Sequence, residues 1–346
     1  MKLIYKIIIT MVILGIMLIT MGLLFGAKLW VYINETGIHV EDTKNNMNQH
    51  KIEEFNLDIF EKVHIDVSYA NIEIIKSDNF GIEILYYEGN PEILWSLENE
   101  TLKIQDKKKE NFYFMNFNFF SIFNWESDYI KIYIPENVEL SDVLIETSGG
   151  NVTICDYISQ KTTINNSYGN VKIANIESEK LEVKLSSGNF KAENVITNDF
   201  DLKNSYGNGI FSNVEANELN IDMSSGNINL KQIEVKNLNI KNSYGNITGE
   251  DLVVFDSDIK TSSGDIKLSG DFLGKNKIKT SYGNIILNAA GIKEEYKLNL
   301  STSYGNVKID GVRNEENSLL SNETLNGKIL EVEASSGNIE VNFKTQ

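Results

Sequence analysis

A short motif of serine, a variable residue, glycine and asparagine recurs along most of this chain at a nearly constant interval. From Gly150 to Gly283 each motif glycine follows the previous one by 19 residues, and the next two intervals are 22 and 32 residues. A fixed period of about 20 residues over so many copies predicts a solenoid in which each copy forms one coil. We expect the motif glycines to be structural turn residues; they are Gly150, Gly169, Gly188, Gly207, Gly226, Gly245, Gly264, Gly283, Gly305 and Gly337.

Aliphatic residues keep fixed positions around the motif, and their spacing indicates strands. Five residues before the glycine every copy has Ile, Val or Leu, and two residues after it only Gly209 departs from Val, Ile or Phe. Positions seven before and four after are mostly apolar too, which predicts two short strands per coil, each with one buried face. We therefore expect an all-β, single-chain parallel β-solenoid with 19-residue coils, right-handed because crossovers between parallel strands favour that hand.

The motif has the chemistry of a sharp bend between these strands. Glycine accepts a positive φ freely, and asparagine tolerates it better than most residues. Coils stack ~4.8 Å apart, so the asparagines should form a hydrogen-bonded ladder at the corner, with Val and Ile ladders inside. Asp265 replaces the asparagine once, and one carboxylate in such a ladder should be accommodated.

The variable residue of the motif alternates between tyrosine and serine from Tyr168 to Tyr282. Alternation leaves each ring room to spread over the smaller neighbour, and the rings then recur every ~9.6 Å. One interpretation is an aromatic cover over the corner, and the other is a surface binding row that stacks against a polymer with a repeating unit. The row consists of Tyr168, Tyr206, Tyr244, Tyr282 and Tyr304, the last of which breaks the alternation along the sequence.

The N-terminal segment has the features of a transmembrane signal anchor. Ile7 to Ala27 contains no charged residue and is bounded by Lys6 and Lys28. A helix of this length spans roughly 31 Å, enough to cross a bilayer core. A cleaved signal peptide is the alternative, but the segment matches the small-x-small cleavage pattern poorly. We expect a single-pass protein of the cytoplasmic membrane, with its N-terminus in the cytoplasm and most of the chain outside the cell.

Four parts follow from these patterns: an anchor at 1–33, a polar tether at 34–52, a β-rich lead-in and cap at 53–140, and the solenoid repeats at 141–346. Ser68 to Asn71 is a degenerate copy of the motif, which indicates that coiling begins before the regular repeats. An aromatic insertion at 111–125 either caps the solenoid or contacts the membrane or a partner. Its candidate contact residues are Phe114, Phe117, Phe119, Phe120 and Trp125.

Composition and missing motifs narrow the function classes. The net charge of −17 argues against a nucleic-acid partner, which requires a basic face. The single cysteine, Cys155, excludes an internal disulfide and a multi-cysteine zinc site, and we expect it to be a small core residue. No cofactor or metal site is expected. The chain also lacks the HExxH, GxSxG and P-loop motifs, so we expect no enzymatic activity, with a carbohydrate-active β-helix enzyme as the alternative.

Three features together resemble a bacterial family of candidate adhesins of unknown function with LiaG-like members. They are the membrane span, the lead-in "FEKVHIDVSYANIEIIKSDNFGIEI", and the passage "IKIYIPENVELSDVLIETSGGNV" followed by S-x-G-N/D coils. The resemblance covers roughly residues 53–346 and implies a β-strand-repeat domain at the cell envelope, without catalytic residues. We expect an adhesin-like binding or scaffolding protein with an envelope glycan or protein partner. The alternative is an envelope-stress sensor or regulator that acts through membrane partners.

Overall fold

A computed structural model describes Met11, Gly15 and the ranges 30–34, 37–41, 49–87, 90–107, 127–136, 138–321 and 327–344. No helix within these ranges is long and apolar enough to cross a membrane. The predicted span Ile7–Ala27 lies outside them, apart from the two isolated residues. The chain divides into two compact units, and the larger one comprises Gln49–Lys108 and Ser127–Gln346.

The end of the predicted anchor and the predicted polar tether contain strands. In the smaller unit β1 (Trp30–Asn34) pairs with β2 (Gly37–Glu41) as an antiparallel hairpin. In the larger unit β3 (Gln49–Phe55) begins before the predicted end of the tether at residue 52. The boundary between tether and lead-in therefore does not coincide with an end of secondary structure.

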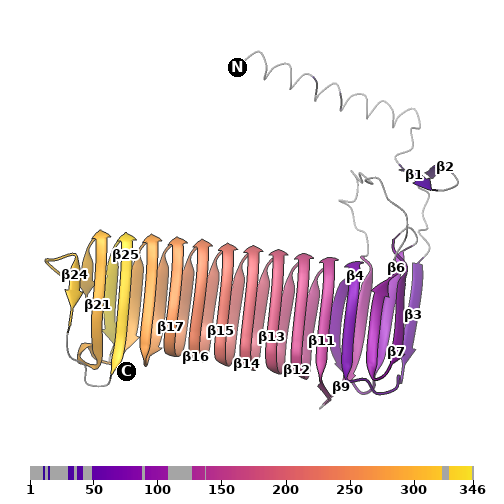
Figure 1. The fold of residues 1–346 in the computed structure, drawn as a ribbon, viewed down its shortest axis with the longest axis horizontal. Helices are drawn as coiled ribbons and strands as arrows, with labels where there is room; N and C mark the ends of the chain where they lie inside the picture. Colours follow the sequence, from indigo (N-terminus) through magenta and orange to yellow (C-terminus); the bar gives the residue numbers. More distant parts are fainter. Residues whose placement is uncertain are drawn as a thin grey trace. The chain divides into compact units, whose positions relative to one another are not determined.

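The middle of the larger unit is a stack of equal strands, each 17 residues long and each forming one coil (Figure 1). Neighbours pair in parallel with a constant shift of 19 residues, so Val152 faces Val171 and Val171 faces Phe190. This register confirms the predicted all-β parallel solenoid, whose handedness stays a prediction. These strands are β12 (Val152–Tyr168), β13 (Val171–Ser187), β14 (Phe190–Tyr206), β15 (Gly209–Ser225), β16 (Ile228–Tyr244) and β17 (Ile247–Ser263).

Each coil has three sides, one more than the sequence pattern predicts. Along β15 the buried residues are spaced by two, except for steps of three after Phe211 and after Ala216. A step of three marks a bend, because it brings the same face of the next segment inward. At the first bend Asn213 has a φ of 54°, and its equivalents in the other coils also have positive φ. The missed side runs from Val214 to Ala216.

The stack departs from sequence order at its C-terminal end. The last coil of the sequence lies between the two coils that precede it, because β25 pairs in parallel with both β19 and β21 (Figure 1). Two antiparallel strands, β23 and β24, then pair with the outermost coil. The strands of this end are β18 (Ile266–Phe272), β19 (Lys275–Tyr282), β20 (Ile285–Ala290), β21 (Tyr296–Tyr304), β22 (Val307–Ile309), β23 (Val312–Arg313), β24 (Ser318–Leu320), β25 (Lys328–Ser336) and β26 (Ile339–Lys344).

At the N-terminal end, too, the order of the coils in space differs from their order in the sequence. The coil formed by β4 and β5 lies between β8 and β9 on one side and β11 and β12 on the other. Antiparallel strands β3, β6 and β7 complete this end, and such strands protect the open edge of a stack. Coiling thus begins at the degenerate motif, as predicted, and extends into the lead-in region. The strands are β4 (Lys62–Tyr69), β5 (Asn71–Ser77), β6 (Gly81–Tyr87), β7 (Ile93–Glu98), β8 (Thr101–Asp106), β9 (Tyr129–Pro135), β10 (Glu139–Leu140) and β11 (Asp142–Gly149).

Aliphatic ladders fill the solenoid, and in the column two residues after the motif glycine Gly209 replaces an aliphatic or aromatic residue for a steric reason. The rings of Phe190, Phe200 and Phe211 pack against one another with centroids 5.5–5.8 Å apart. A Cβ at Gly209 would lie 3.2 Å from both Phe211 and Met223. The glycine therefore makes room for three aromatic rings in a column that otherwise holds Val, Ile or Phe.

The motif corner depends on close contact between coils. Gly226 has a φ of +132°, and a Cβ added there would lie 1.9 Å from the carbonyl oxygen of Gly207 in the preceding coil. Beside the glycines, each backbone N–H of the asparagine column donates to the side-chain oxygen of the preceding coil, as from Asn227 to Asn208 at 2.9 Å. Asp265 accepts the same bond from Asn284 at 2.7 Å. The predicted asparagine ladder and the tolerance of Asp265 are both confirmed.

Candidate functional site

The tyrosines of the motif line one edge of the solenoid, which we call the tyrosine edge. Their side chains are 65–80% exposed, although large aromatic residues in a folded domain are usually well covered. Tyr69 from the degenerate motif belongs to the same row, because it pairs with Gly149 in register. The tyrosine edge consists of Tyr69, Tyr168, Tyr206, Tyr244, Tyr282 and Tyr304.

Tyrosines occupy every second coil along the whole tyrosine edge. The inserted coil places Ser336 between Tyr282 and Tyr304, since it pairs with both. At the other end Gly149 lies between Tyr69 and Tyr168. The apparent break at Tyr304 is therefore a property of the sequence order only, and the strict alternation gives rings about 9.6 Å apart.

The alternation extends to the residue three positions before the motif glycine. In three tyrosine coils this residue is a buried asparagine, and the amide donates to a glycine carbonyl of the preceding coil at 2.9–3.0 Å. In two of the serine coils the same position holds the apolar Leu185 or Met223. From the coil of Tyr168 to that of Tyr244 this corner thus repeats as a two-coil unit; the asparagines are Asn166, Asn204 and Asn242. Thr261 and Thr280 occupy the position in the next two coils, so the alternation of this residue ends there.

A groove runs beside the tyrosine edge, along the motif serines. It consists of two hollows of about 520 and 390 Å³ that meet at Asp222. One wall is the column of serines two residues before each glycine, from Ser148 to Ser335. The other carries the residues four positions before the glycine, which are mostly charged. We call this feature the serine groove.

The charged wall of the serine groove carries five lysines, together with Asp66, Glu146, Asp222 and Glu333. Lys260 pairs with Asp258 at 2.6 Å, and Lys279 pairs with Glu333. Asp222 interrupts the row. The other three lysines make no ion pair within the part of the chain that the structure describes; they are Lys184, Lys203 and Lys241.

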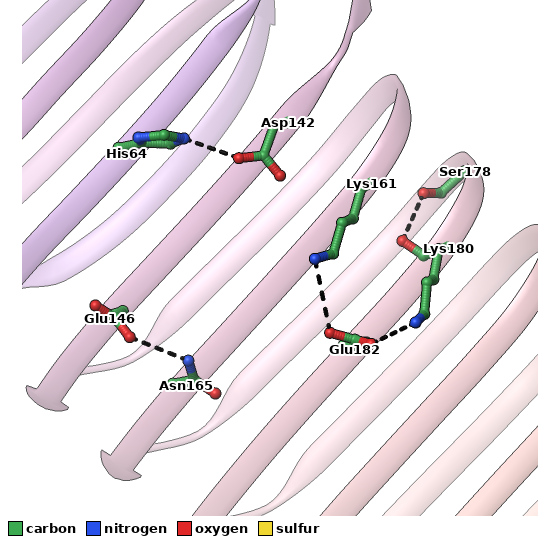
Figure 2. A network of polar contacts seen from close by, with 8 residues as sticks. All are labelled: His64, Asp142, Glu146, Lys161, Asn165, Ser178, Lys180 and Glu182. Atoms are coloured by element: carbon green, nitrogen blue, oxygen red, sulfur yellow. Dashed lines mark hydrogen bonds and ion pairs between the residues drawn. The ribbon is translucent and has the colours of Figure 1, made fainter.

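Towards the N-terminal end of this face several charged side chains are paired with one another (Figure 2). Glu182 forms an ion pair with Lys180 at 2.6 Å and lies 4.0 Å from Lys161 of the adjacent coil. The hydrogen bond from Lys180 lowers the pKa of Glu182. His64 and Asp142 form a further contact at 2.8 Å (Figure 2). Lys161 and Lys180 are thus paired with Glu182, whereas Lys184, Lys203 and Lys241 of the serine groove make no ion pair among the described residues.

One buried polar cluster was not predicted from the sequence. Glu83 accepts hydrogen bonds from Tyr129 at 2.6 Å and Tyr133 at 3.0 Å, and Lys51 lies 3.1 Å away. Burial alone would raise the pKa of Glu83, but these bonds outweigh it and lower the pKa to about 2. Burial and the bond to Glu83 raise the pKa of Tyr133 to about 12. The cluster joins β3, β6 and β9, so we assign it a structural role at this end of the stack.

Two other expectations from the sequence concern Cys155 and metal binding. Cys155 is half-buried and not fully within the core, and burial raises the pKa of its thiol. No group of three His, Cys, Asp or Glu side chains within the described ranges lies close enough to hold a metal ion.

A family model matches the chain over residues 60–195 and again over 177–342, and together these segments cover most of the sequence. The model describes the Toastrack DUF4097 domain. The chain belongs to the Toastrack DUF4097 family. Its two matched segments correspond to the two halves of a single continuous Toastrack stack. No curated protein matches the sequence.

Three solved structures are similar to this Toastrack chain at low sequence identity. A candidate adhesin from Bacteroides fragilis NCTC 9343 has 13% identity and a TM-score of 0.35, over 86% of this chain and 98% of that one. A candidate adhesin from Parabacteroides distasonis ATCC 8503 has 12% identity and a TM-score of 0.35, over 85% and 97%. A candidate cell adhesion protein from Clostridium sporogenes ATCC 15579 has 13% identity and a TM-score of 0.21, over 85% and 100%.

The Toastrack stack brings the predicted tyrosine row together in one line and places the motif glycines at its corner. The predicted contact residues of the aromatic insertion, from Phe114 to Trp125, lie outside the described residues. Sequence reasoning missed the lysine wall of the serine groove. Its signal was the recurrence of lysine three residues before tyrosine, in "KNSYGN" at 203–208 and 241–246 and "KTSYGN" at 279–284.

Proposed function

We propose that this protein is a non-enzymatic, adhesin-like component of the cell envelope that binds an extended polymer along the tyrosine edge. The observation that carries the proposal is the row of exposed tyrosines at every second coil. A tyrosine ring presents a flat apolar face and a polar hydroxyl, so it suits stacking against a sugar or another ring. A regular row of such rings suits a ligand with a regular repeat.

The proposal includes a membrane anchor and display outside the cytoplasmic membrane. Its support is the uncharged run Ile7–Ala27, with Lys2 and Lys6 on the short N-terminal side. The anchor would hold the solenoid at the membrane surface, where envelope polymers are within reach. The regulatory alternative depends on the aromatic insertion at 111–125, which lies outside the described residues.

A binding assay with the full-length chain tests the proposal. Purified cell wall and envelope glycans would be incubated with the wild type, with Tyr206→Ser/Tyr244→Ser, and with Phe255→Ser. Phe255 is the matched control, because it is an exposed aromatic residue outside the motif corner. We expect the double tyrosine variant to lose most binding and the control to retain it. Equal binding by all three proteins would contradict the proposal, and breakdown of a glycan would favour the enzyme alternative.

A further inference from the structure

Three lysines of the groove wall lie in three successive tyrosine coils, and this arrangement limits the chemistry of a ligand. In the coils of Tyr206, Tyr244 and Tyr282 a lysine lies three residues before the tyrosine, on the groove side of the corner. Successive pairs are separated by two coils, or about 9.6 Å. These three two-coil units each offer one flat ring with one cation beside it, from Lys203, Lys241 and Lys279. The two other lysines of the wall, Lys184 and Lys260, lie in serine coils.

Lysines lie on both flanks of the tyrosine edge. Three residues after the motif glycine the chain has Lys172, Lys191 and Lys267, of which Lys172 and Lys191 pair with Glu193 at 3.8 and 2.8 Å. Acidic residues around this stretch of the edge include Asp222 within the serine groove and Asp265 in the asparagine ladder. The whole chain has 49 acidic and 32 basic residues, whereas the serine groove is lined by five lysines and four acidic residues, so the groove is less negative than the molecule as a whole. An anionic ligand is therefore repelled less at this edge than elsewhere, and Lys203 and Lys241 supply the direct attraction.

The lysines nearest the rings are available for a ligand. Lys203 and Lys241 make no ion pair among the described residues, and Lys279 pairs with Glu333. Between Lys203 and Lys241 the register places Asp222, whose carboxylate makes no contact within ion-pair distance in the same part of the chain. The motif serines line the floor beside these lysines, and hydroxyl groups both donate and accept hydrogen bonds.

We propose that the ligand is a linear acidic polysaccharide whose disaccharide repeat carries one carboxylate. A disaccharide in an extended β-linked chain has about the length of one two-coil unit. Each tyrosine would stack on one sugar face, each lysine would pair with one carboxylate, and the serines would bond hydroxyl groups of the sugars. This inference rests on the proposed function and adds the charge and repeat of the ligand to it.

The test uses the full-length chain and two probes of matched length, hyaluronan and chitin oligosaccharides of about ten sugars, long enough to pass three tyrosines at ~9.6 Å intervals. Hyaluronan carries one carboxylate per disaccharide, and chitin carries none. Affinity would be measured by isothermal titration calorimetry at low and high salt for the wild type and Lys203→Gln/Lys241→Gln. The matched control is Lys231→Gln/Lys236→Gln, which removes two exposed lysines of β16 outside the serine groove.

We expect hyaluronan to bind at least tenfold more tightly than chitin oligosaccharide. In the Lys203→Gln/Lys241→Gln variant most of this difference in affinity should disappear, and high salt should have the same effect on the wild type. The control variant should keep the difference. Equal binding of both probes, unaffected by the lysine variant but lost in Tyr206→Ser/Tyr244→Ser, would overturn the inference and leave the proposed function standing. Binding of neither probe would count against both. The inference would also be overturned if polyglutamate bound as tightly as hyaluronan and if the Tyr206→Ser/Tyr244→Ser variant bound both as tightly as the wild type. Binding would then depend on charge alone.

Discussion

The corner glycines should be intolerant of even one methyl group, and Gly226→Ala tests this most clearly. Its φ of +132° is one that alanine adopts only with strain, which costs about 1–2 kcal/mol. The added Cβ would also lie 1.9 Å from the Gly207 carbonyl oxygen and 2.6 Å from the Gly207 carbonyl carbon. Backbone atoms cannot rotate away as a side chain would, so adjacent coils must move apart, at a further cost of about 1–3 kcal/mol.

We therefore expect Gly226→Ala to reduce the free energy of unfolding by about 2–5 kcal/mol, which for a unit of this size corresponds to a fall in Tm of roughly 3–8 °C. Thermal unfolding of the full-length chain, followed by far-ultraviolet circular dichroism, provides the measurement. Gly311→Ala is the matched control, because Gly311 also has a positive φ, +77°, but no atom lies within 4 Å of its added Cβ. Gly311→Ala should lose only the free energy of unfolding that comes from backbone strain, about 1–2 kcal/mol. Equal effects of the two substitutions would refute the stacking argument.

Three further predictions follow from the contacts of single residues. Asn227→Ala removes the acceptor of the Asn246 N–H and should cost about 1 kcal/mol in urea unfolding, whereas Asn227→Asp should cost less because Asp265 already fills this role. Gly209→Val should destabilise by about 1–3 kcal/mol by overpacking the phenylalanine cluster, and a Tm equal to that of wild type would show that the cluster has spare volume. Glu83 has its pKa lowered to about 2, below the unfolded value of about 4.3, so the stability it contributes is present above pH ~4.3 and is lost as the pH falls towards 2. Urea unfolding between these pH values should show a loss of about 2 kcal/mol in the wild type that is absent in Glu83→Gln, and parallel profiles would contradict this role.

The sequence predicts the repeat length and stacking of the coils better than it predicts the number of sides in each coil. The column that includes Val183 and Ile221 is aliphatic in every copy, so its strand is evident from periodicity alone. The missed third side has Ser178 and Thr197 at inward positions of two coils, and buried hydroxyl residues weaken an apolar pattern. The bend that begins this side is made by Asn213 and its equivalents, which in sequence resemble ordinary polar residues of an exposed strand face.

The order of the coils in space could not be predicted from the intervals between motif glycines. The positions of the motif tyrosines did contain this information. Intervals of 22 and 32 residues show only that the last coils have longer connections. Nearest-neighbour stacking in sequence order would place Tyr282 beside Tyr304, two large exposed rings on adjacent coils. Inserting the coil of Ser336 between them restores the alternation and separates the rings. The same preference for a small neighbour beside each tyrosine was visible in the sequence and would have indicated the interleaved order.

Cysteine cross-linking tests the interleaved stack, on which the continuous tyrosine edge depends. In a Cys155→Ser background, Lys279→Cys would be combined either with Glu333→Cys or with Ser301→Cys. Residue 333 is the direct register partner of both 279 and 301, so the first pair is one coil apart and the second pair two coils apart. Adjacent strands lie ~4.8 Å apart, within the Cα separation that a disulfide spans, whereas ~9.6 Å is beyond it. We predict rapid oxidation of the 279/333 pair and none of the 279/301 pair; the reverse result would contradict the interleaved order and the regular edge built on it.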